Sequence, residues 1–141
     1  MAMTMHCDIA STEARIFSGR VESLVATGVL GDMGILPGHA ALLTALVPGP
    51  VRLVTQAGEE QIYYVSGGYL EVQPGVVNIL ADTAIRADDM DEVQAELAKR
   101  EAEEAVINRD AAFEYSRAAT QLAEATAQIR TIQQLRKKLG K

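Results

Sequence analysis

The distribution of glycine and proline divides this chain of 141 residues into two parts with different architectures. Ten of the eleven glycines and all four prolines precede residue 76, whereas residues 76–139 contain neither. Glycine and proline mark turns between short elements, and both weaken the interior of a helix. The sequence therefore predicts a two-domain β + α chain, in which a β-rich N-terminal part gives way to a helical part near residue 86.

The N-terminal part has the pattern of short strands joined by tight turns. β-Branched and aromatic residues at 21–25 and 62–65, and the alternation at 77–81, are typical of strands. Residues 56–59 form a predicted hairpin loop, and Pro74-Gly75 has the signature of a type II turn. Many short strands at this spacing indicate a sandwich or a flattened barrel.

The most unusual stretch of this part is residues 31–40, which holds three glycines and a proline. Such a cluster predicts a set of tight turns at a sheet edge, with Asp32 and His39 as its polar members. A cluster of this kind, taken alone, usually does no more than form turns between strands.

The C-terminal part predicts two helices, at about 89–107 and 112–137, with Asp88 or Asp89 as the first N-cap. The connection at Asn108-Arg109-Asp110 is so short that the helices must form an antiparallel hairpin. The predicted domains are therefore residues 1–86 and 87–141.

Both predicted helices carry an apolar face that is rich in alanine. The first face comprises Ala95, Ala98, Ala102 and Ala105, with Val93, Leu97 and Val106 alongside; the second comprises Tyr115, Ala118, Leu122, Ala125, Ile129 and Ile132. Alanine is the best helix former but buries little surface. Two interpretations stay open: an ordinary, closely packed helical hairpin, or an arm that can leave its docking site without losing its helices.

Charge changes sign along the chain. Residues 1–85 carry three basic and eight acidic side chains, residues 86–116 carry four and ten, and residues 117–141 carry six and one. We expect Arg130 to lie near the acidic start of the first helix (Asp88, Asp89 and Asp91). We expect the basic end of the chain to approach the acidic sandwich through Arg136, Lys137, Lys138 and Lys141. A basic C-terminus also suits the helix dipole without any further role.

Several function classes are disfavoured. A net charge of −6 argues against binding of nucleic acid. No apolar run is long enough to cross a membrane, and the N-terminus has neither a signal-peptide nor a transit-peptide pattern. Cys7 is the only cysteine and is expected to fill space in the first strand. Neither a phosphate-binding loop nor a nucleophile–histidine–carboxylate pattern occurs, so we expect no intrinsic catalysis. The only soft metal ligands are His6, Cys7 and His39, so we expect no metal site.

Three motifs in order, Gly31–Ala40, Val65–Gly75 and Leu80–Ala84, resemble the epsilon subunit of bacterial F-type ATP synthase. The resemblance implies a ten-stranded β-sandwich followed by a two-helix arm, in a non-catalytic central-stalk subunit of the proton-translocating enzyme. It implies that the sandwich binds the γ subunit and the c-ring, and that the arm can reach the α/β catalytic head and inhibit ATP hydrolysis. The expected location is peripheral, at the cytoplasmic face of the bacterial inner membrane.

The resemblance also suggests roles for particular residues. Asp32 and His39 become candidates for contact with the ring, and the basic side chains of the arm become candidates for contact with the head: Arg117, Arg130, Arg136, Lys137 and Lys138. Family members that bind ATP carry Ile/Leu-Asp-x-x-Arg-Ala at the start of the first helix. Here Asp91 and Ala95 are kept, but Gln94 replaces the arginine, and a neutral amide cannot replace a guanidinium at a phosphate. We therefore expect weak or no ATP binding and no cofactor.

Two other functions remain as alternatives at this level. One is a free nucleotide-sensing module whose helices close over ATP, which Gln94 disfavours. The other is an adaptor with a β-sandwich and a helical hairpin that has no connection with ATP synthase.

Overall fold

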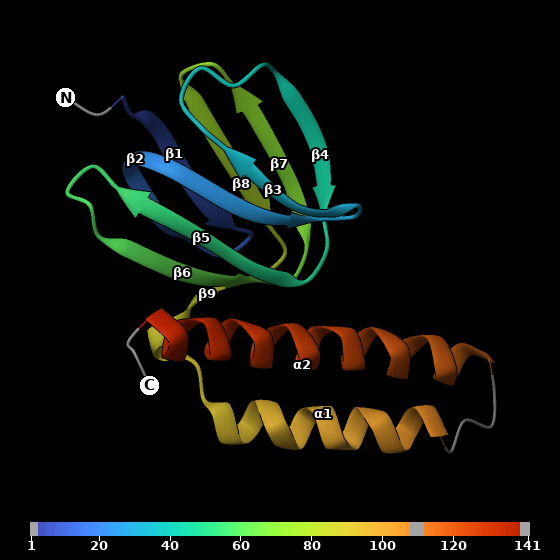
Figure 1. Ribbon diagram of the computed structural model, residues 1–141. Helices are drawn as coiled ribbons and strands as arrows, with labels where there is room; N and C mark the ends of the chain where they lie inside the picture. The colour runs from blue at the N-terminus through green and yellow to red at the C-terminus, as the bar shows by residue number, and fades with distance from the viewer. Residues whose placement is uncertain (1–2, 108–111, 139–141) are drawn as a thin grey trace.

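The computed structural model describes residues 3–107 and 112–138, and it contains a β-sandwich followed by two packed helices (Figure 1). The expected fold class is confirmed, with nine strands among the described residues instead of ten. The strands are β1 (Met5–Ser11), β2 (Arg15–Gly28), β3 (Gly31–Ile35), β4 (Leu42–Leu46), β5 (Gly49–Thr55), β6 (Glu60–Val65), β7 (Gly68–Gln73), β8 (Val76–Ala81) and β9 (Ala84–Arg86).

The strands form two layers that share β2. One layer runs β1-β8-β7-β4, and the other contains β2, β5, β6 and β9, with β3 on the outer edge of β2. The 14 residues of β2 pair with β1 near their start and with β3 and β5 near their end, so that this strand passes from one layer to the other. The pairing of β1 with β8 is parallel, and it brings the first strand beside a strand close to the boundary with the helices.

The interior of the sandwich is a single apolar cluster drawn from both layers. Its members include Cys7, Leu24, Leu53, Leu70 and Ile79. The Cys7 side chain is completely buried, as expected for a residue that fills space in the first strand, and burial raises the pKa of its thiol to about 12. Of the helical side chains that the structure describes, none belongs to this cluster. The core of the sandwich is therefore complete without the helices.

The glycine-rich stretch 31–40 does not form the predicted run of turns. Its first half is β3, an edge strand, and only the residues on either side of this strand turn. Gly34 has no positive φ, and edge strands tolerate glycine because one of their sides lies open. The turn at Pro74-Gly75 lies where it was predicted, but Gly75 lacks the positive φ that a type II turn requires, so the type was wrong.

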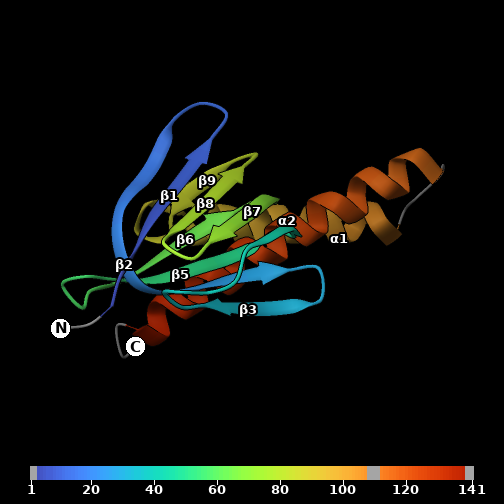
Figure 2. The ribbon, with the colours of Figure 1, turned by 90° about the horizontal axis from the view of Figure 1, so that it is seen from above.

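The helices α1 (Glu92–Ile107) and α2 (Ala112–Lys138) lie against one side of the sandwich. In Figure 1, α2 runs between the sandwich and α1, so that α1 is the outer element. Seen from above in Figure 2, both helices extend past the end of the sandwich. The short connection that was predicted for residues 108–110 lies outside the described residues. Neither helix, over the described residues, is both long and apolar enough to cross a membrane.

The first helix begins three residues later than expected. Residues 87–89 form a turn of 3-10 helix, and Asp88 pairs with Arg86 (Oδ2–Nε 3.4 Å). The N-cap is Asp91, whose Oδ1 accepts the backbone N–H groups of Val93 (2.9 Å) and Gln94 (3.3 Å). Asp88 and Asp89 were therefore the wrong caps, because only one of several adjacent aspartates can sit at the residue where helical geometry starts.

Candidate functional site

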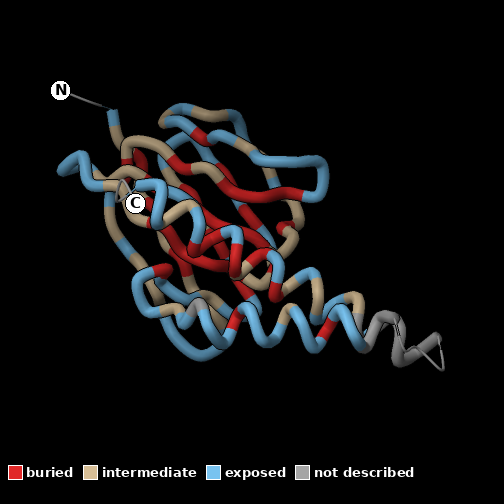
Figure 3. Tube along the Cα trace, turned by 60° about the horizontal axis from the view of Figure 1, so that its bottom comes forward, coloured by how far each residue is buried: buried red, intermediate tan, exposed pale blue. Residues whose placement is uncertain are grey.

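The arm meets the sandwich on the outer face of β5 and β6. Along β6, Tyr63 and Val65 point into the sandwich core, whereas Ile62 and Tyr64 point outward. The two outward side chains are nevertheless buried, Tyr64 to 1% exposure, because α2 covers them. Figure 3 shows the same arrangement as a band of buried residues where α2 crosses the strands.

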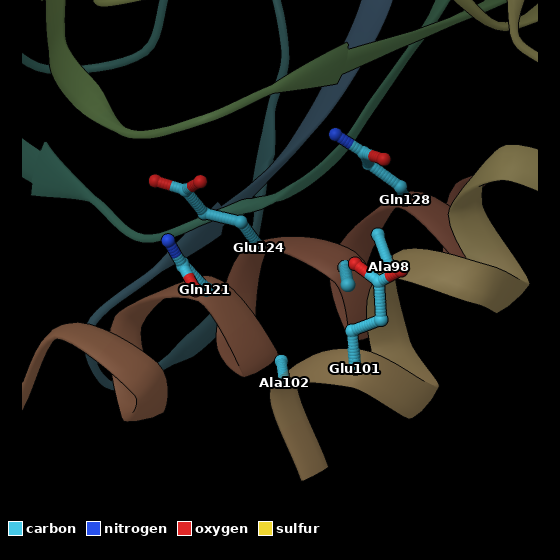
Figure 4. A pocket seen from close by; sticks show the side chains of 7 residues that line it. Ala98, Glu101, Ala102, Gln121, Glu124 and Gln128 are labelled. Carbon is cyan, nitrogen blue, oxygen red and sulfur yellow. The ribbon is translucent and has the colours of Figure 1, made fainter. Parts of the chain in front are cut away.

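The side of α2 that faces the sandwich is mostly polar or small. Helical spacing places Glu124, Ala127, Gln128 and Thr131 on this side, and Figure 4 shows Glu124 and Gln128 extending from α2 toward the strands. Thr131 is fully buried and donates its hydroxyl to the carbonyl of Ala127 (2.8 Å), so its polar group is satisfied within the helix. On the α2 side, the docking interface therefore offers mostly small or polar side chains to Ile62 and Tyr64, with the half-buried Leu135 one turn further along.

The Tyr64 hydroxyl is the least satisfied group of this interface. It is buried and, among the described residues, makes no hydrogen bond of ordinary geometry. Burial, and after it the Glu124 carboxylate, raises the pKa of Tyr64 to about 12, and a side-chain interaction with the Gln128 amide opposes this shift. Because this neutral hydroxyl is covered without a hydrogen bond of ordinary geometry among the described residues, it weakens the docking of α2.

A separate small cluster joins the two helices. Ile129 and Ile132 of α2 pack with Ala95 of α1 and with Met90. Ala102 and Ala125 are also buried, as predicted for the alanine-rich faces. Val93 and Leu97 were expected beside that seam, and Ala98 within it, but all three are exposed, because only one side of α1 packs on α2 among the described residues. The predicted seam residues Ala105, Val106, Tyr115 and Ala118 lie outside the described side chains.

One ion pair connects the arm with the glycine-rich edge of the sandwich. Nη2 of Arg130 donates to Oδ2 of Asp32 at 3.0 Å and to Oδ1 at 3.4 Å, and each side chain is 46% exposed. The expectation that Arg130 would meet the acidic start of α1 was wrong. Arg130 lies on the side of α2 toward β3, and Asp88 is engaged by Arg86.

The basic end of α2 approaches the sandwich, as expected for Lys138. Its Nζ donates to the backbone carbonyl of Glu60, at the start of β6. Arg117, Arg136 and Lys137 are exposed. Lys141 lies outside the described residues.

His39 is not brought together with Asp32. Asp32 lies at the start of β3, whereas His39 follows the end of that strand, and its Nδ1 bonds the carbonyl of Ala40 (2.7 Å). The neighbouring Gly38 bonds the carbonyl of Pro74 in the β7–β8 turn (2.8 Å). The two sequence-predicted ring contacts therefore occupy opposite ends of one strand.

The residues of the degenerate ATP motif line a cavity of about 360 Å³ beside the start of α1. Asp91 is the helix cap, Ala95 is buried, and Gln94 lies at the rim. A second cavity of about 500 Å³ opens between the helices (Figure 4) and is lined by Ala98, Glu101, Ala102, Gln121, Glu124, Ala125 and Gln128. The described linings carry acidic and neutral side chains and no lysine or arginine, which is unfavourable for a phosphate.

A second surface, which we had not anticipated, lies on the outer face of β4, β7 and β8. Tyr69 pairs with Ala45 on one side and with Leu80 on the other, and Tyr69 and Leu80 are each 59% exposed. Leu43 is exposed on the same face. The signal in the sequence was the pair of adjacent apolar residues in each strand, Tyr69-Leu70 and Ile79-Leu80, where alternation with polar residues would have indicated a solvated face.

Comparison with known families identifies both parts of the chain. Residues 4–87 match the family model described as "ATP synthase, Delta/Epsilon chain, beta-sandwich domain". Residues 88–133 match the model described as "ATP synthase, Delta/Epsilon chain, long alpha-helix domain".

Two solved structures contain chains of similar fold. A chain in the cryo-EM structure of the Euglena gracilis mitochondrial ATP synthase, described as OSCP/F1/c-ring in rotational state 1, has a TM-score of 0.76 and 20% identity, and the match covers 96% of this chain and 81% of that chain. A chain in the Tetrahymena thermophila mitochondrial ATP synthase, described as central stalk/c-ring, has a TM-score of 0.60 and 14% identity, with coverage of 94% and 96%.

Proposed function

This chain belongs to the delta/epsilon family of ATP synthase subunits, and we propose that it couples the c-ring to the catalytic head through γ and restrains ATP hydrolysis with its helices. A member of this family is a non-catalytic subunit of the central stalk, in an enzyme of ATP synthesis and proton transport. Membership excludes the unrelated adaptor that the sequence had left open.

The γ subunit is proposed to contact the outer face of β4, β7 and β8. Exposed Leu43, Tyr69 and Leu80 form an apolar surface there, and such surfaces on otherwise polar proteins mark interfaces. The arm docks on the opposite layer, over β5 and β6, so γ and the docked arm can be bound together. We expect Tyr69→Ser with Leu80→Ser to weaken the binding of purified γ without unfolding the sandwich, because both side chains lie outside its core.

The c-ring is proposed to contact the end of the sandwich that holds the β2–β3 turn. Leu30 in this turn is fully exposed (102%), Val29 is largely exposed, and Asp32 follows directly. The related structures from Euglena and Tetrahymena are described as containing a c-ring. His39 lies at the far end of β3, so the proposed ring contact rests on Asp32, and a role of His39 in the same contact would need a second surface.

The single observation that carries the inhibitory role is the separation of the two apolar clusters. Among the described residues, the sandwich core contains no helical residue, and most side chains on the docking face of α2 are small or polar. The arm can therefore leave the sandwich without opening its core. The basic side chains proposed to meet the head after release are Arg117, Arg130, Arg136, Lys137 and Lys138.

The test adds the full-length chain, or a version that ends at residue 87, to a catalytic head stripped of its own subunit. We expect the full chain to inhibit ATP hydrolysis and the truncated chain to bind without inhibiting. Equal inhibition by both would exclude the arm as the inhibitory element. A matched variant keeps both helices but has Arg136 and Lys137 replaced with glutamine. It tests whether inhibition needs the positive charge of these two side chains or only the presence of the arm.

The nucleotide-sensing alternative is disfavoured by the acidic linings of both helical cavities. We expect calorimetry with micromolar ATP to detect no saturable binding by the isolated chain. Gln94→Arg would return the missing guanidinium to the rim and is expected to raise the affinity for ATP. Saturable micromolar binding by the unaltered chain would contradict the proposal.

The domain boundaries and the location are proposed on the same basis. Residues 1–86 form the unit that binds γ and the ring, and residues 87–141 form the regulatory arm. The subunit is proposed to lie peripherally at the cytoplasmic face of a bacterial inner membrane. Fractionation of cells is the direct measurement: the chain should sediment with membranes and be released together with the catalytic head.

A further inference from the structure

We propose that Asp32 is shared between the arm and a cationic group of the partner that meets the β2–β3 end of the sandwich, so that binding of this partner weakens the docking of α2. The inference rests on the proposed contact of this end with the c-ring. It links the β2–β3 end of the sandwich with the docking site of α2, two surfaces that otherwise have separate roles.

The geometry of the Asp32–Arg130 pair carries the proposal. A single guanidinium nitrogen of Arg130 lies within reach of both carboxylate oxygens, at 3.0 and 3.4 Å. The two residues are 98 positions apart in sequence, so the pair forms only while α2 lies on the sandwich. Its half-exposed position leaves the carboxylate open to a second group from solvent or from a partner.

The surroundings of Asp32 indicate the chemistry of that second group. Val29 and Leu30 form an exposed apolar tip three and two residues before the carboxylate. A partner that covers the tip brings its own side chains to Asp32, and a carboxylate accepts hydrogen bonds and attracts cations. A lysine or arginine placed there would also lie close to Arg130, and like charges repel. The cationic group of the partner and Arg130 of the arm therefore compete for the Asp32 carboxylate.

The expected size of the coupling is modest. Half-exposed ion pairs change an equilibrium by up to about five-fold, and binding linkage is reciprocal. We expect the partner to raise the undocked population of α2 about two- to five-fold, and the docked arm to weaken the partner's binding by the same factor. An effect of this size shifts the docking equilibrium of α2 but does not hold the arm in one state.

The test uses a reporter of undocking in the full-length chain. Ala127→Cys places a thiol on the buried side of α2, where maleimide can reach it only after α2 leaves the sandwich. Native Cys7 stays silent because it is completely buried. We expect Asp32→Asn and Arg130→Gln each to raise the labelling rate about two- to five-fold, and the charge reversal Asp32→Arg with Arg130→Asp to return it toward the original rate. Glu13→Gln, an exposed carboxylate in the β1–β2 turn, is the matched control and should leave the rate unchanged.

The cognate c-ring with its γ subunit is then added. We expect a two- to five-fold faster labelling of the reporter chain, and no further acceleration in the Asp32→Asn background. If the ring assembly binds but leaves the labelling rate unchanged, the shared-acceptor inference is wrong while the proposed function stands. If the assembly does not retain the chain in a pull-down, the proposed ring contact itself fails. Rates that are unaffected by Asp32→Asn in the isolated chain also overturn the inference.

Discussion

Two adjacent tyrosines on β6 provide a sharp test of how the arm docks. Tyr64 points outward under α2, and its hydroxyl is buried without a hydrogen bond of ordinary geometry among the described residues. Tyr63 points into the sandwich, and its hydroxyl donates to Oε1 of Gln61 at 2.7 Å. Replacing each by phenylalanine removes the same atom from opposite sides of one strand.

The two substitutions should have effects of opposite sign. A buried polar group that lacks a partner costs about 1–3 kcal/mol, so Tyr64→Phe should raise the free energy of unfolding by about 1 kcal/mol. A formed hydrogen bond contributes about 0.5–1.5 kcal/mol, so Tyr63→Phe should lower the free energy by a similar amount. In a chain of this size, a change of 1 kcal/mol shifts the Tm by about 4 °C.

Urea unfolding of the full chain and of a chain that ends at residue 87 measures both effects. The gain from Tyr64→Phe should disappear in the shorter chain, where the hydroxyl is in water. The loss from Tyr63→Phe should remain, because its partner lies in the sandwich. If Tyr64→Phe destabilises the full chain, the hydroxyl makes a hydrogen bond under α2, and the reasoning about a weakened docking interface fails.

The Tyr64 hydroxyl also sets the pH above which the docking of α2 weakens. The pKa of Tyr64 is raised from an ordinary value near 10 to about 12 in the folded chain, so its ionisation leaves the free energy of docking unchanged below pH 10 and lowers it as pH rises from 10 through 12. Absorbance of the phenolate in the Tyr63→Phe and Tyr64→Phe variants assigns this titration. A Tyr64 that ionises near pH 10 would mean that α2 does not cover it.

Three further results are expected from the described contacts. Raising the salt concentration should speed amide exchange across residues 112–138, because the half-exposed Asp32–Arg130 pair that holds α2 is screened; unchanged exchange would argue against electrostatic docking. Gly68→Ala should lower the free energy of unfolding by about 3 kcal/mol or more in thermal unfolding, because the φ of Gly68 is positive (+139°) and a Cβ would overlap the backbone of β8. Its control is Gly34→Ala, where open space surrounds the added Cβ and the free energy of unfolding should change by less than about 0.5 kcal/mol. The Ser18 hydroxyl, followed by the positive charges of His6 and Arg15, lowers the pKa of Asp8, so the stability difference between the unaltered chain and Asp8→Asn should shrink as pH falls below about 4.

Local rules were sufficient wherever one segment decides its own structure. The absence of glycine and proline after residue 75 predicted the helices, and the turn at 56–59 was predicted from Gly58, which does adopt a positive φ (84°). The buried alanines of the helical seam followed from their three- and four-residue spacing. These features depend on backbone sterics and on periodicity, both of which are written in consecutive residues.

Local rules failed where several neighbours compete or where an edge is involved. Any of Asp88, Asp89 and Asp91 could have capped α1. Asp91 is the cap because its backbone lies at the start of the helix. The glycines at 31–34 indicated turns, yet these residues form a strand because they pair with β2. A partner strand that lies elsewhere in the chain is invisible to a reading of the segment alone.

The sequence by itself determined the division into a sandwich and two helices, the alanine-rich seam between the helices, and the basic character of the last one. Only the tertiary structure decided that α2 lies between the sandwich and α1, that Arg130 meets Asp32, and that Ile62 and Tyr64 are covered. The physical reason is that α2 has two usable sides. Its spacing of apolar residues specifies one side for α1, whereas the small and polar side meets a sheet whose position depends on the folding of the other 86 residues.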